Sequence, residues 1–339
     1  MASLGADLAP GWAVAVSGGG DSVALMHLAA HYARGRDLPL PIVVTVDHGL
    51  RPASAKDAKS VASWARRLEL KAQVLTWRGK KPKTGIEAAA RDARYRLMGR
   101  FLHDNKITIL FAGHNQDDQA ETFLLRLARG SGLDGLAGMP ALGNWPVAGF
   151  AGLKLARPLL GLGREALRDY LRAKDQAWLE DPMNQDPAFD RIKVRQAQTV
   201  LAEAGLSAAR IAAAAAHLAR ARESLEVMTE AVLARALRKQ DESGVVLDGA
   251  ALAAAPREVG LRALARVLMT VGGETYRPRF DSLERLFDRI AAQDLRGGAT
   301  LHGCQLRPLG NKGGEFAPYA LSITRESPRK TVSSTKGRS

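Results

Sequence analysis

A run of three glycines between hydroxyl and carboxylate side chains is suited to binding a phosphate group. It reads Ser17-Gly18-Gly19-Gly20-Asp21-Ser22. Because glycine lacks a Cβ atom, the backbone N–H groups of such a loop can point into a phosphate. Ser17 and Ser22 can donate hydrogen bonds to its oxygens, and Asp21 can hold Mg²⁺ against them. A plain turn between strand and helix is the alternative, but these residue types favour a nucleotide site.

A second block combines carboxylates with a histidine. Gly113–Thr122 reads GHNQDDQAET, and its charged or titratable residues are His114, Asp117, Asp118 and Glu121. Asp117 can cap the helix that begins here, and the helix dipole favours anions at that end. Asp118 and Glu121 are three residues apart on one helical face, where they could hold Mg²⁺ or a substrate amine. The residues alone leave both ligands open.

Two further blocks bring polar groups to the same region. Asp47–Arg51 predicts a turn in which Asp47 caps backbone N–H groups, and the end of the preceding strand should place it beside the nucleotide. Farther along, helical spacing puts Arg91, Arg94 and Tyr95 on neighbouring surface. The residues expected to face the core are Ile86, Ala90, Ala93, Leu97 and Phe101. By itself, this basic face could equally be a solvated one.

Strands and helices alternate in the first half of the chain, and they must position these blocks. The predicted strands are Trp12–Val16, Pro41–Val46, Ala72–Trp77 and Ile107–Ala112, and helices are expected near Ala55–Leu68 and Ile86–His103. A capping box of Thr84 and Glu87 opens the second helix. This order predicts an α/β fold with a doubly wound parallel sheet, whose ligands bind at the carboxyl ends of the strands.

The second half is mainly helical and ends in short β-like runs. The predicted helices are Ser207–Lys239 and Arg257–Val271, and the β-like runs are Val245–Leu247 and a hairpin within Ala299–Arg325. We expect a nucleotide domain over 1–160, a helical domain over 161–240, a small α+β domain over 241–325 and a basic, disordered tail over 326–339.

The charge balance favours a polyanionic partner. The chain has 49 Lys and Arg against 35 Asp and Glu, a formal net charge of +14. Between residues 64 and 106 there are 12 basic and 4 acidic side chains. Nucleic acid is the obvious partner, although a basic composition by itself could also serve solubility.

The cysteine content and hydropathy exclude several classes of protein. Cys304 is the only cysteine, so the chain has no internal disulfide, no cysteine-rich zinc site and no thiolate-bound cluster. In the predicted strand Ala299–Leu309, Cys304 should be a small buried apolar residue. No apolar run approaches membrane-spanning length and no signal-peptide pattern begins the chain, so we expect a cytoplasmic protein that does not interact with membranes.

The glycine loop resembles the SGGxDS loop of enzymes that cleave ATP between its α and β phosphates. Branches that transfer sulfur generally use cysteine pairs, which this chain lacks. Other segments resemble the VDHGLR, ARxxRY, RGSGLxGL, RPLL and WxEDPxN motifs of the tRNA(Ile)-lysidine synthetase family; they are Val46–Arg51, Ala90–Tyr95, Arg129–Leu136, Arg157–Leu160 and Trp178–Asn184. Where that family usually has RNxIR, this chain has Ile192 in place of Asn.

The resemblance implies an adenine nucleotide alpha hydrolase-like fold and a specific reaction. In this reaction, free L-lysine is ligated to the 2-position of the wobble cytidine of a CAU-anticodon tRNA(Ile) through an adenylated tRNA. The reaction consumes ATP, uses bound Mg²⁺, and releases AMP and diphosphate. It implies ATP contacts from Ser17, Gly18, Gly19, Gly20, Asp21, Ser22, Asp47 and His48, and metal contacts from Asp21 and Asp118. It implies catalytic roles for Asp21, Arg91, Arg94, His114, Asp117, Asp118 and Glu121, and tRNA contacts from Arg51, Arg126, Arg129, Arg191, Lys193 and Arg195.

Two other functions fit parts of the sequence. A small-molecule ATP pyrophosphatase, such as an amide synthetase, would use the same loop but would need no extended basic surface. A non-catalytic RNA-binding protein on a nucleotide-binding fold would not need an intact glycine loop and acidic block. The helical second half and the net charge favour the tRNA enzyme, and no obligatory protein partner is evident.

Overall fold

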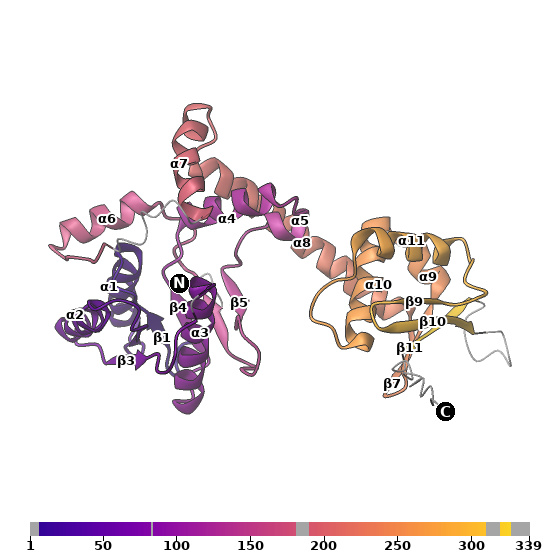
Figure 1. The fold of residues 1–339 in the computed structure, drawn as a ribbon, viewed down its shortest axis with the longest axis horizontal. Helices are drawn as coiled ribbons and strands as arrows, with labels where there is room; N and C mark the ends of the chain where they lie inside the picture. Colours follow the sequence, from indigo (N-terminus) through magenta and orange to yellow (C-terminus); the bar gives the residue numbers. More distant parts are fainter. Residues whose placement is uncertain (1–6, 83, 181–189, 310–318, 327–339) are drawn as a thin grey trace, which may run out of the picture. The chain divides into compact units, whose positions relative to one another are not determined.

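A computed structural model describes residues 7–82, 84–180, 190–309 and 319–326, with the side chains of 190–192 left out. The chain divides into two units, Met1–Arg220 and Ala221–Ser339, and each is described by itself (Figure 1). The boundaries expected at 160, 240 and 325 stay predictions. The expected basic tail lies outside the described residues except for Glu326.

The first unit is built on a six-stranded sheet in its described part, and it confirms the predicted doubly wound α/β fold. Its strands are β1 (Ala13–Ala15), β2 (Ile42–Asp47), β3 (Ala72–Thr76), β4 (Ile109–Ala112), β5 (Leu142–Asn144) and β6 (Lys154–Ala156). They lie in the order β3-β2-β1-β4-β6-β5. All neighbours are parallel except β5, which is antiparallel to β6. The sequence did not predict β5 and β6, which have only three residues each.

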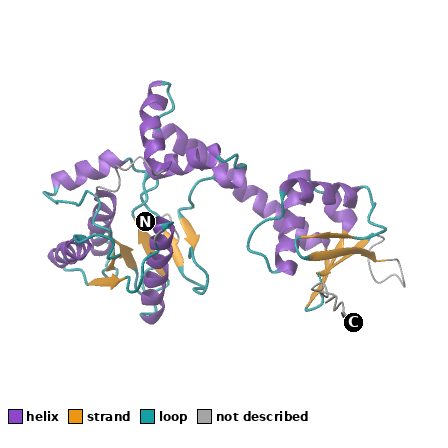
Figure 2. Ribbon diagram, viewed as in Figure 1, coloured by secondary structure: helices purple, strands orange, loops and turns teal. Residues whose placement is uncertain are grey.

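Helices cover both faces of this sheet (Figure 2). Those that pack on it are α1 (Gly20–Arg34), α2 (Ser54–Arg67) and α6 (Arg164–Ala173) on one face and α3 (Ile86–Asp104) on the other. The chain also forms α4 (Gln116–Ala128), α5 (Leu133–Leu136) and α7 (Asp190–Glu203). Residues of α1, α2 and α6 share one buried core with Val14 of β1. The neighbouring Ala13 joins a second core with residues of α3. Successive residues of β1 thus point to opposite faces, as the pleat of a strand requires.

Two details of α3 differ from the prediction. Gly85, with φ +62°, precedes the first helical residue and no side chain caps the helix, so the capping box of Thr84 and Glu87 is not formed. Tyr95 is buried rather than on the surface. The indole Nε1 of Trp145, just after β5, donates a hydrogen bond of 3.2 Å to the carbonyl oxygen of Tyr95, and the two rings lie edge to face. The unpredicted β5 segment supplies the partner that buries Tyr95.

The second unit has a five-stranded antiparallel sheet in its described part, packed against helices. After α8 (Ala208–Ala236) come β7 (Leu237–Asp241), β8 (Gly244–Asp248), α9 (Gly249–Ala253), α10 (Arg257–Gly272), α11 (Phe280–Ala291), β9 (Ala299–Leu301), β10 (Cys304–Leu309) and β11 (Ala320–Arg325). The strand order is β7-β8-β11-β10-β9. The helix predicted to reach Lys239 therefore ends at Ala236, and the predicted hairpin is part of a larger sheet.

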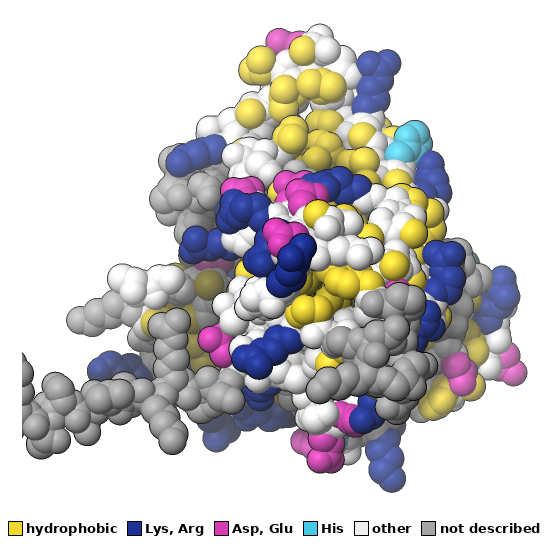
Figure 3. Space-filling model, turned by 90° about the vertical axis from the view of Figure 1, so that its right-hand side faces the viewer, with side chains coloured by type: hydrophobic (Ala, Val, Ile, Leu, Met, Phe, Trp, Pro, Cys, Tyr) yellow, Lys and Arg dark blue, Asp and Glu magenta, His cyan; other side chains and the backbone are white. Residues whose placement is uncertain are grey.

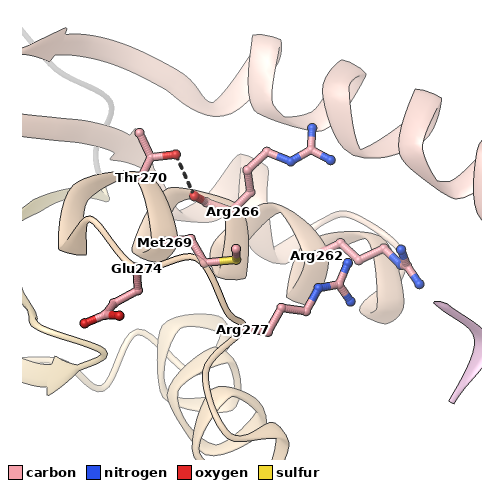
Figure 4. Close-up of a pocket in the computed structure, with 6 residues that line it drawn as sticks. All are labelled: Arg262, Arg266, Met269, Thr270, Glu274 and Arg277. Atoms are coloured by element: carbon pink, nitrogen blue, oxygen red, sulfur yellow. Dashed lines mark hydrogen bonds between the residues drawn. The ribbon is translucent and has the colours of Figure 1, made fainter. Parts of the chain in front are cut away.

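Charged side chains of the second unit largely pair with one another. On the side shown in Figure 3, Lys and Arg side chains are interspersed with Asp and Glu. A hollow beside α10 is lined by Arg262, Arg266, Met269, Thr270, Glu274 and Arg277 (Figure 4). Arg262 pairs with Glu226 and Glu258, and Arg266 also pairs with Glu226. These arginines already have carboxylate partners, so the hollow carries little free positive charge.

Cys304 behaves as the sequence predicts. Its side chain is fully buried on β10, and its thiol donates to the carbonyl oxygen of Leu268 at 3.3 Å. Burial raises the pKa of this thiol to about 11, so it stays protonated at neutral pH.

We predict that Cys304→Ser retains full activity, because a serine hydroxyl can donate to the same carbonyl and no thiol chemistry is involved. Turnover and thermal stability of the variant would be measured together. A folded but inactive variant would contradict this prediction and support a sulfur-transfer reaction instead.

Among the described helices, none is both long and apolar enough to span a bilayer alone; α7 and α8 pass such a test only as a pair bent by 100°.

Candidate functional site

The glycine loop joins β1 to α1 and is braced by its own serines. Gly18 has φ +97°, a conformation that favours glycine. The Ser22 hydroxyl accepts from the backbone N–H of Ser17 at 3.2 Å and donates to the carbonyl oxygen of Gly19 at 2.8 Å. The loop lies at the carboxyl end of β1 and at the N-terminus of a 15-residue helix, where backbone N–H groups and the helix dipole favour an anion.

A segment distant in sequence lies directly against this loop. The backbone N–H of Leu179 donates to the carbonyl oxygen of Gly18 at 2.9 Å. A Cβ atom on Gly18 would lie 2.5 Å from the Leu179 side chain, and one on Gly20 would lie 3.6 Å from the Trp178 ring. Close packing therefore requires glycine at position 18, whereas a Cβ atom on Gly20 would make only an ordinary contact. Sequence reasoning assigned no site role to Trp178 or Leu179.

The acidic block begins α4, but with a different cap from the predicted one. Asn115 is fully buried, and its side-chain oxygen accepts from the Asp118 backbone N–H at 2.9 Å. The Asp118 carboxylate accepts in return from the Asn115 backbone N–H at 3.0 Å, which completes a capping box. Asp117, the expected cap, instead accepts from the backbone N–H of Arg164 at 2.8 Å. Asn115 caps the helix because it is the N-cap residue, whereas Asp117 is already within the helix.

Arg164 at the start of α6 is the centre of the carboxylate cluster, and sequence reasoning missed it. Its guanidinium lies 3.2 Å from Glu121, 3.7 Å from Asp118 and 3.9 Å from Asp21. Arg195 of α7 also binds Glu121, with Nε 2.6 Å from Oε1. Arg164 thus joins the glycine loop to the acidic block. Its only sequence signal was an arginine after Gly163 at a helix start, which many surface helices share.

The electrostatics of the cluster centre on Asp21. Burial raises the pKa of the Asp21 carboxyl, and the nearby Asp118 charge raises it further. The positive charge of Arg164 opposes both effects. Glu121 has only 1% of its side chain exposed, and its contacts with Arg164 and Arg195 compensate for this burial. The cluster is a set of carboxylates held together by arginines.

The second and third blocks meet beside this region. One Asp47 oxygen accepts from the Gly49 N–H at 2.9 Å and from the Ser54 hydroxyl at 2.6 Å, which forms the predicted turn. His48 Nε2 accepts from Arg94 Nε at 3.3 Å. Burial first, and then the charge of Arg94, lower the pKa of His48 to about 4, so its ring is neutral at physiological pH.

The remaining predicted catalytic residues flank these contacts. The Arg91 guanidinium is exposed and lies 5.1 Å from the centre of the Tyr95 ring. His114 is half-buried between β4 and the capping Asn115. Arg91 thus lies beside Tyr95 on α3, and His114 directly precedes the cap of α4.

The residues predicted to bind tRNA have different surroundings, and their role stays a prediction. Arg51 pairs with Asp57 at 3.1 Å, and Arg126 donates to the carbonyl oxygens of Gly135 and Gly138 at 2.6 and 3.2 Å. Arg195 belongs to the carboxylate cluster. Arg129 and Lys193 are exposed, and the side chain of Arg191 lies outside the described residues, as does the neighbouring Ile192.

The carboxylates of this site could hold a magnesium ion only if phosphate oxygens also bound the ion. Within the described ranges, His, Cys, Asp and Glu side chains form no group of three or more arranged to hold a metal. Asp21 and Asp118 nevertheless lie close enough to raise the pKa of Asp21. A cation between them would relieve this repulsion, and Mg²⁺ commonly takes one or two carboxylates together with phosphate oxygens and waters.

The end of β4 touches the start of α1 because Gly113 has no side chain. This close contact can be tested by substitution. A Cβ atom here would lie 2.9 Å from Ser22 Cα and 3.0 Å from the Asp21 carbonyl. Because backbone cannot move as a side chain can, Gly113→Ala should displace the glycine loop, cost about 1–3 kcal/mol of stability and weaken ATP binding.

Gly161→Ala is the matched control, because nothing lies within 4 Å of the added methyl group. ATP binding by calorimetry and thermal unfolding would be compared for both variants. Equal ATP affinity in Gly113→Ala and wild type would show that the loop is not held by this contact.

Comparison with known proteins identifies several relatives of this chain. A family model of the PP-loop domain matches residues 4–201. The chain is 45% identical over 266 residues to a tRNA(Ile)-lysidine synthase of Ruegeria pomeroyi, covering 78% of this chain and 62% of that protein. With a tRNA(Ile)-lysidine synthase of a Bradyrhizobium strain it shares 39% identity over 328 residues, covering 94% and 90%. A solved U34-tRNA thiolase of Methanococcus maripaludis matches with a TM-score of 0.49 at 17% identity, over 63% of this chain and 71% of that chain.

Proposed function

Since the chain belongs to the tRNA(Ile)-lysidine synthase family of PP-loop proteins, we propose that it ligates free L-lysine to the wobble cytidine of a CAU-anticodon tRNA(Ile). ATP is consumed, and AMP and diphosphate are released. The observation that carries the proposal is the Arg164 cluster, because it joins Asp21 of the glycine loop to Asp118 and Glu121 of the acidic block. A phosphate site and a site for an amine thus share one set of charges.

In the proposed first step, the cytosine 2-oxo group attacks the α-phosphate of ATP and diphosphate leaves. The N–H groups of Gly18, Gly19 and Gly20 and the hydroxyls of Ser17 and Ser22 hold the phosphates, with Asp47 and His48 bordering the nucleotide. Arg91 and Arg94 stabilise the charge that develops during transfer, as donors fixed in place before the reaction do. Asp21 and Asp118 would hold Mg²⁺, which supplies neutralisation of the phosphate charge when bound.

In the proposed second step, the lysine amine loses a proton and displaces AMP from the base. Asp118 attracts the ammonium form, Glu121 holds Arg164 next to Asp118, and Asp117 fixes the backbone of Arg164. We assign to His114, at the start of the block, the role of taking the proton from the amine. We assign tRNA contacts to Arg51, Arg126, Arg129, Arg191, Lys193 and Arg195. We also propose that the reaction takes place in the cytoplasm.

The anticodon base provides the decisive test. Cytosine offers a 4-amino donor beside its ring acceptor and 2-oxo group, whereas uracil reverses the donor and acceptor pattern. A site fitted to cytosine leaves polar groups unpaired with uracil, at roughly 1–3 kcal/mol per misfit. We therefore predict that changing the wobble cytidine of the tRNA to uridine stops lysine incorporation while tRNA binding persists.

Diphosphate release and incorporation of labelled lysine would be followed with each tRNA and without tRNA. Equal incorporation into both RNAs would contradict the proposed specificity. Turnover with ATP and lysine alone would identify a small-molecule ligase instead.

A further inference from the structure

The loop after β3 is a basic segment held at the same edge of the sheet as the glycine loop. We define the Trp77 loop as residues 77–82, which read Trp-Arg-Gly-Lys-Lys-Pro. The backbone N–H of Trp77 donates to the carbonyl oxygen of Asp47 at 2.9 Å, and Asp47 pairs with Thr76 in the register of β2 and β3. The loop therefore starts at the carboxyl end of β3, beside the DHG turn.

Contacts within the Trp77 loop give it a defined shape. The Lys81 ammonium lies 4.0 Å from the centre of the Trp77 ring and also donates to the Trp77 carbonyl oxygen. The His48 ring packs edge-on against Trp77, with centroids 6.1 Å apart. A cation over an indole face is attracted by the ring, and both groups lose freedom when they pack in this way. The contacts of Trp77 with Lys81 and His48 therefore hold the start of the loop in place, and the other basic side chains extend from it.

Two cations of this loop have no carboxylate partner among the residues that the structure describes. Arg78 and Lys80 are exposed, and no carboxylate in the described part of the chain pairs with either of them. This distinguishes the Trp77 loop from the hollow beside α10, where Arg262 and Arg266 bind glutamates. Unpaired surface cations grouped in this way favour a polyanion.

We propose that Arg78 and Lys80 of the Trp77 loop bind backbone phosphates of the tRNA next to the reacting base, an inference that rests on the proposed function. β3 lies two strands from β1 in the sheet, which separates the Trp77 loop from the glycine loop by about 10 Å. A base that enters the site to reach the α-phosphate must leave its stack, and its flanking phosphodiesters then lie at the rim of the site. The two cations are placed at this rim.

The test compares cations at opposite ends of the same sheet. The variant carries Arg78→Ala with Lys80→Ala. The control carries Arg36→Ala with Lys71→Ala; both of these residues are exposed and precede β2 and β3, so they lie at the amino edge of the sheet. Each variant removes two positive charges, and ATP binding by each checks that the first unit is folded.

Affinity for the substrate tRNA would be measured over a series of salt concentrations. For the Trp77 loop variant we expect binding to weaken about tenfold or more at low salt, and the slope of log affinity against log salt to become shallower by roughly 1.5, since each phosphate contact contributes about 0.7–0.9. The control should keep the wild-type slope.

An unchanged slope in the Trp77 loop variant, or an equal loss in the control, would overturn the proposal. These outcomes differ from failure of the proposed function. If the wild-type protein binds the tRNA with the expected slope but releases no diphosphate with lysine, the binding surface stands and the reaction is wrong.

Discussion

Replacing Asp21 by alanine should abolish ATP-dependent diphosphate release while leaving tRNA affinity nearly unchanged. Asp21 lies in the glycine loop, 3.9 Å from the Arg164 guanidinium and close enough to Asp118 for that charge to raise its pKa. Its loss removes a carboxylate from the group that neutralises and positions the phosphates. Because such preorganised charges act in the transition state, we expect a fall in turnover of at least about a hundredfold.

The control for this variant is Asp92→Ala, which removes an exposed carboxylate that pairs only at the surface of α3 with Arg96. Diphosphate release would be followed at saturating ATP, lysine and tRNA, and tRNA binding would be measured separately. Near-normal adenylation by Asp21→Ala would mean that the role assigned to this carboxylate is wrong. A parallel loss of tRNA affinity would indicate that the variant is misfolded rather than chemically impaired.

Replacing Arg164 by methionine should have a comparable effect, with a distinctive dependence on pH. Methionine keeps most of the length of the side chain but removes the charge that faces Asp21, Asp118 and Glu121. Arg195 still pairs with Glu121, so the buried carboxylate is not left alone, and the protein should fold with a loss of about 3 kcal/mol or less. The carboxylates no longer have a common anchor, and we expect turnover to fall about a hundredfold.

The pH profile separates this role from a purely structural one. Burial raises the pKa of Asp21 and Arg164 lowers it, so Arg164→Met should raise that pKa further. The active form requires the ionised carboxylate, so the acid limb of the activity profile should move to higher pH. Arg172→Met on the same helix, an exposed arginine that pairs with Asp169, should leave the limb in place. An identical limb in wild type and Arg164→Met would exclude the proposed coupling to Asp21.

Local sequence signals predicted the central sheet because each of its main strands is an apolar run followed by a polar block. Strand β2, for example, was expected over Pro41–Val46 and lies over Ile42–Asp47. In a parallel sheet, consecutive β-to-α turns fall at one edge, so the sequence alone predicts that the glycine loop, the DHG turn and the acidic block lie at the same edge. The resemblance to one enzyme family rests on these same blocks.

Contacts between distant segments could not be read from the sequence. Tyr95 has helical spacing that fits a surface position, and only the packing of Trp145 against it makes it part of the core. β5 (Leu-Gly-Asn) and β6 (Lys-Leu-Ala) escaped prediction because, unlike the equally short β1, neither lies in a continuous apolar run. Their stability comes from the neighbouring strands.

Residue types indicate which ligands each segment of this protein can bind, whereas the packing of distant helices sets which charged groups meet. Residue types fix what a glycine loop or a carboxylate can bind, because donors, acceptors and backbone freedom are local properties. Arg164 and Arg195 acquire their roles only when α6 and α7 bring them to Glu121, 43 and 74 residues away along the chain. An arginine has the same sequence pattern on a solvated helix as over a buried carboxylate, and only the fold sets the distance that makes the interaction strong.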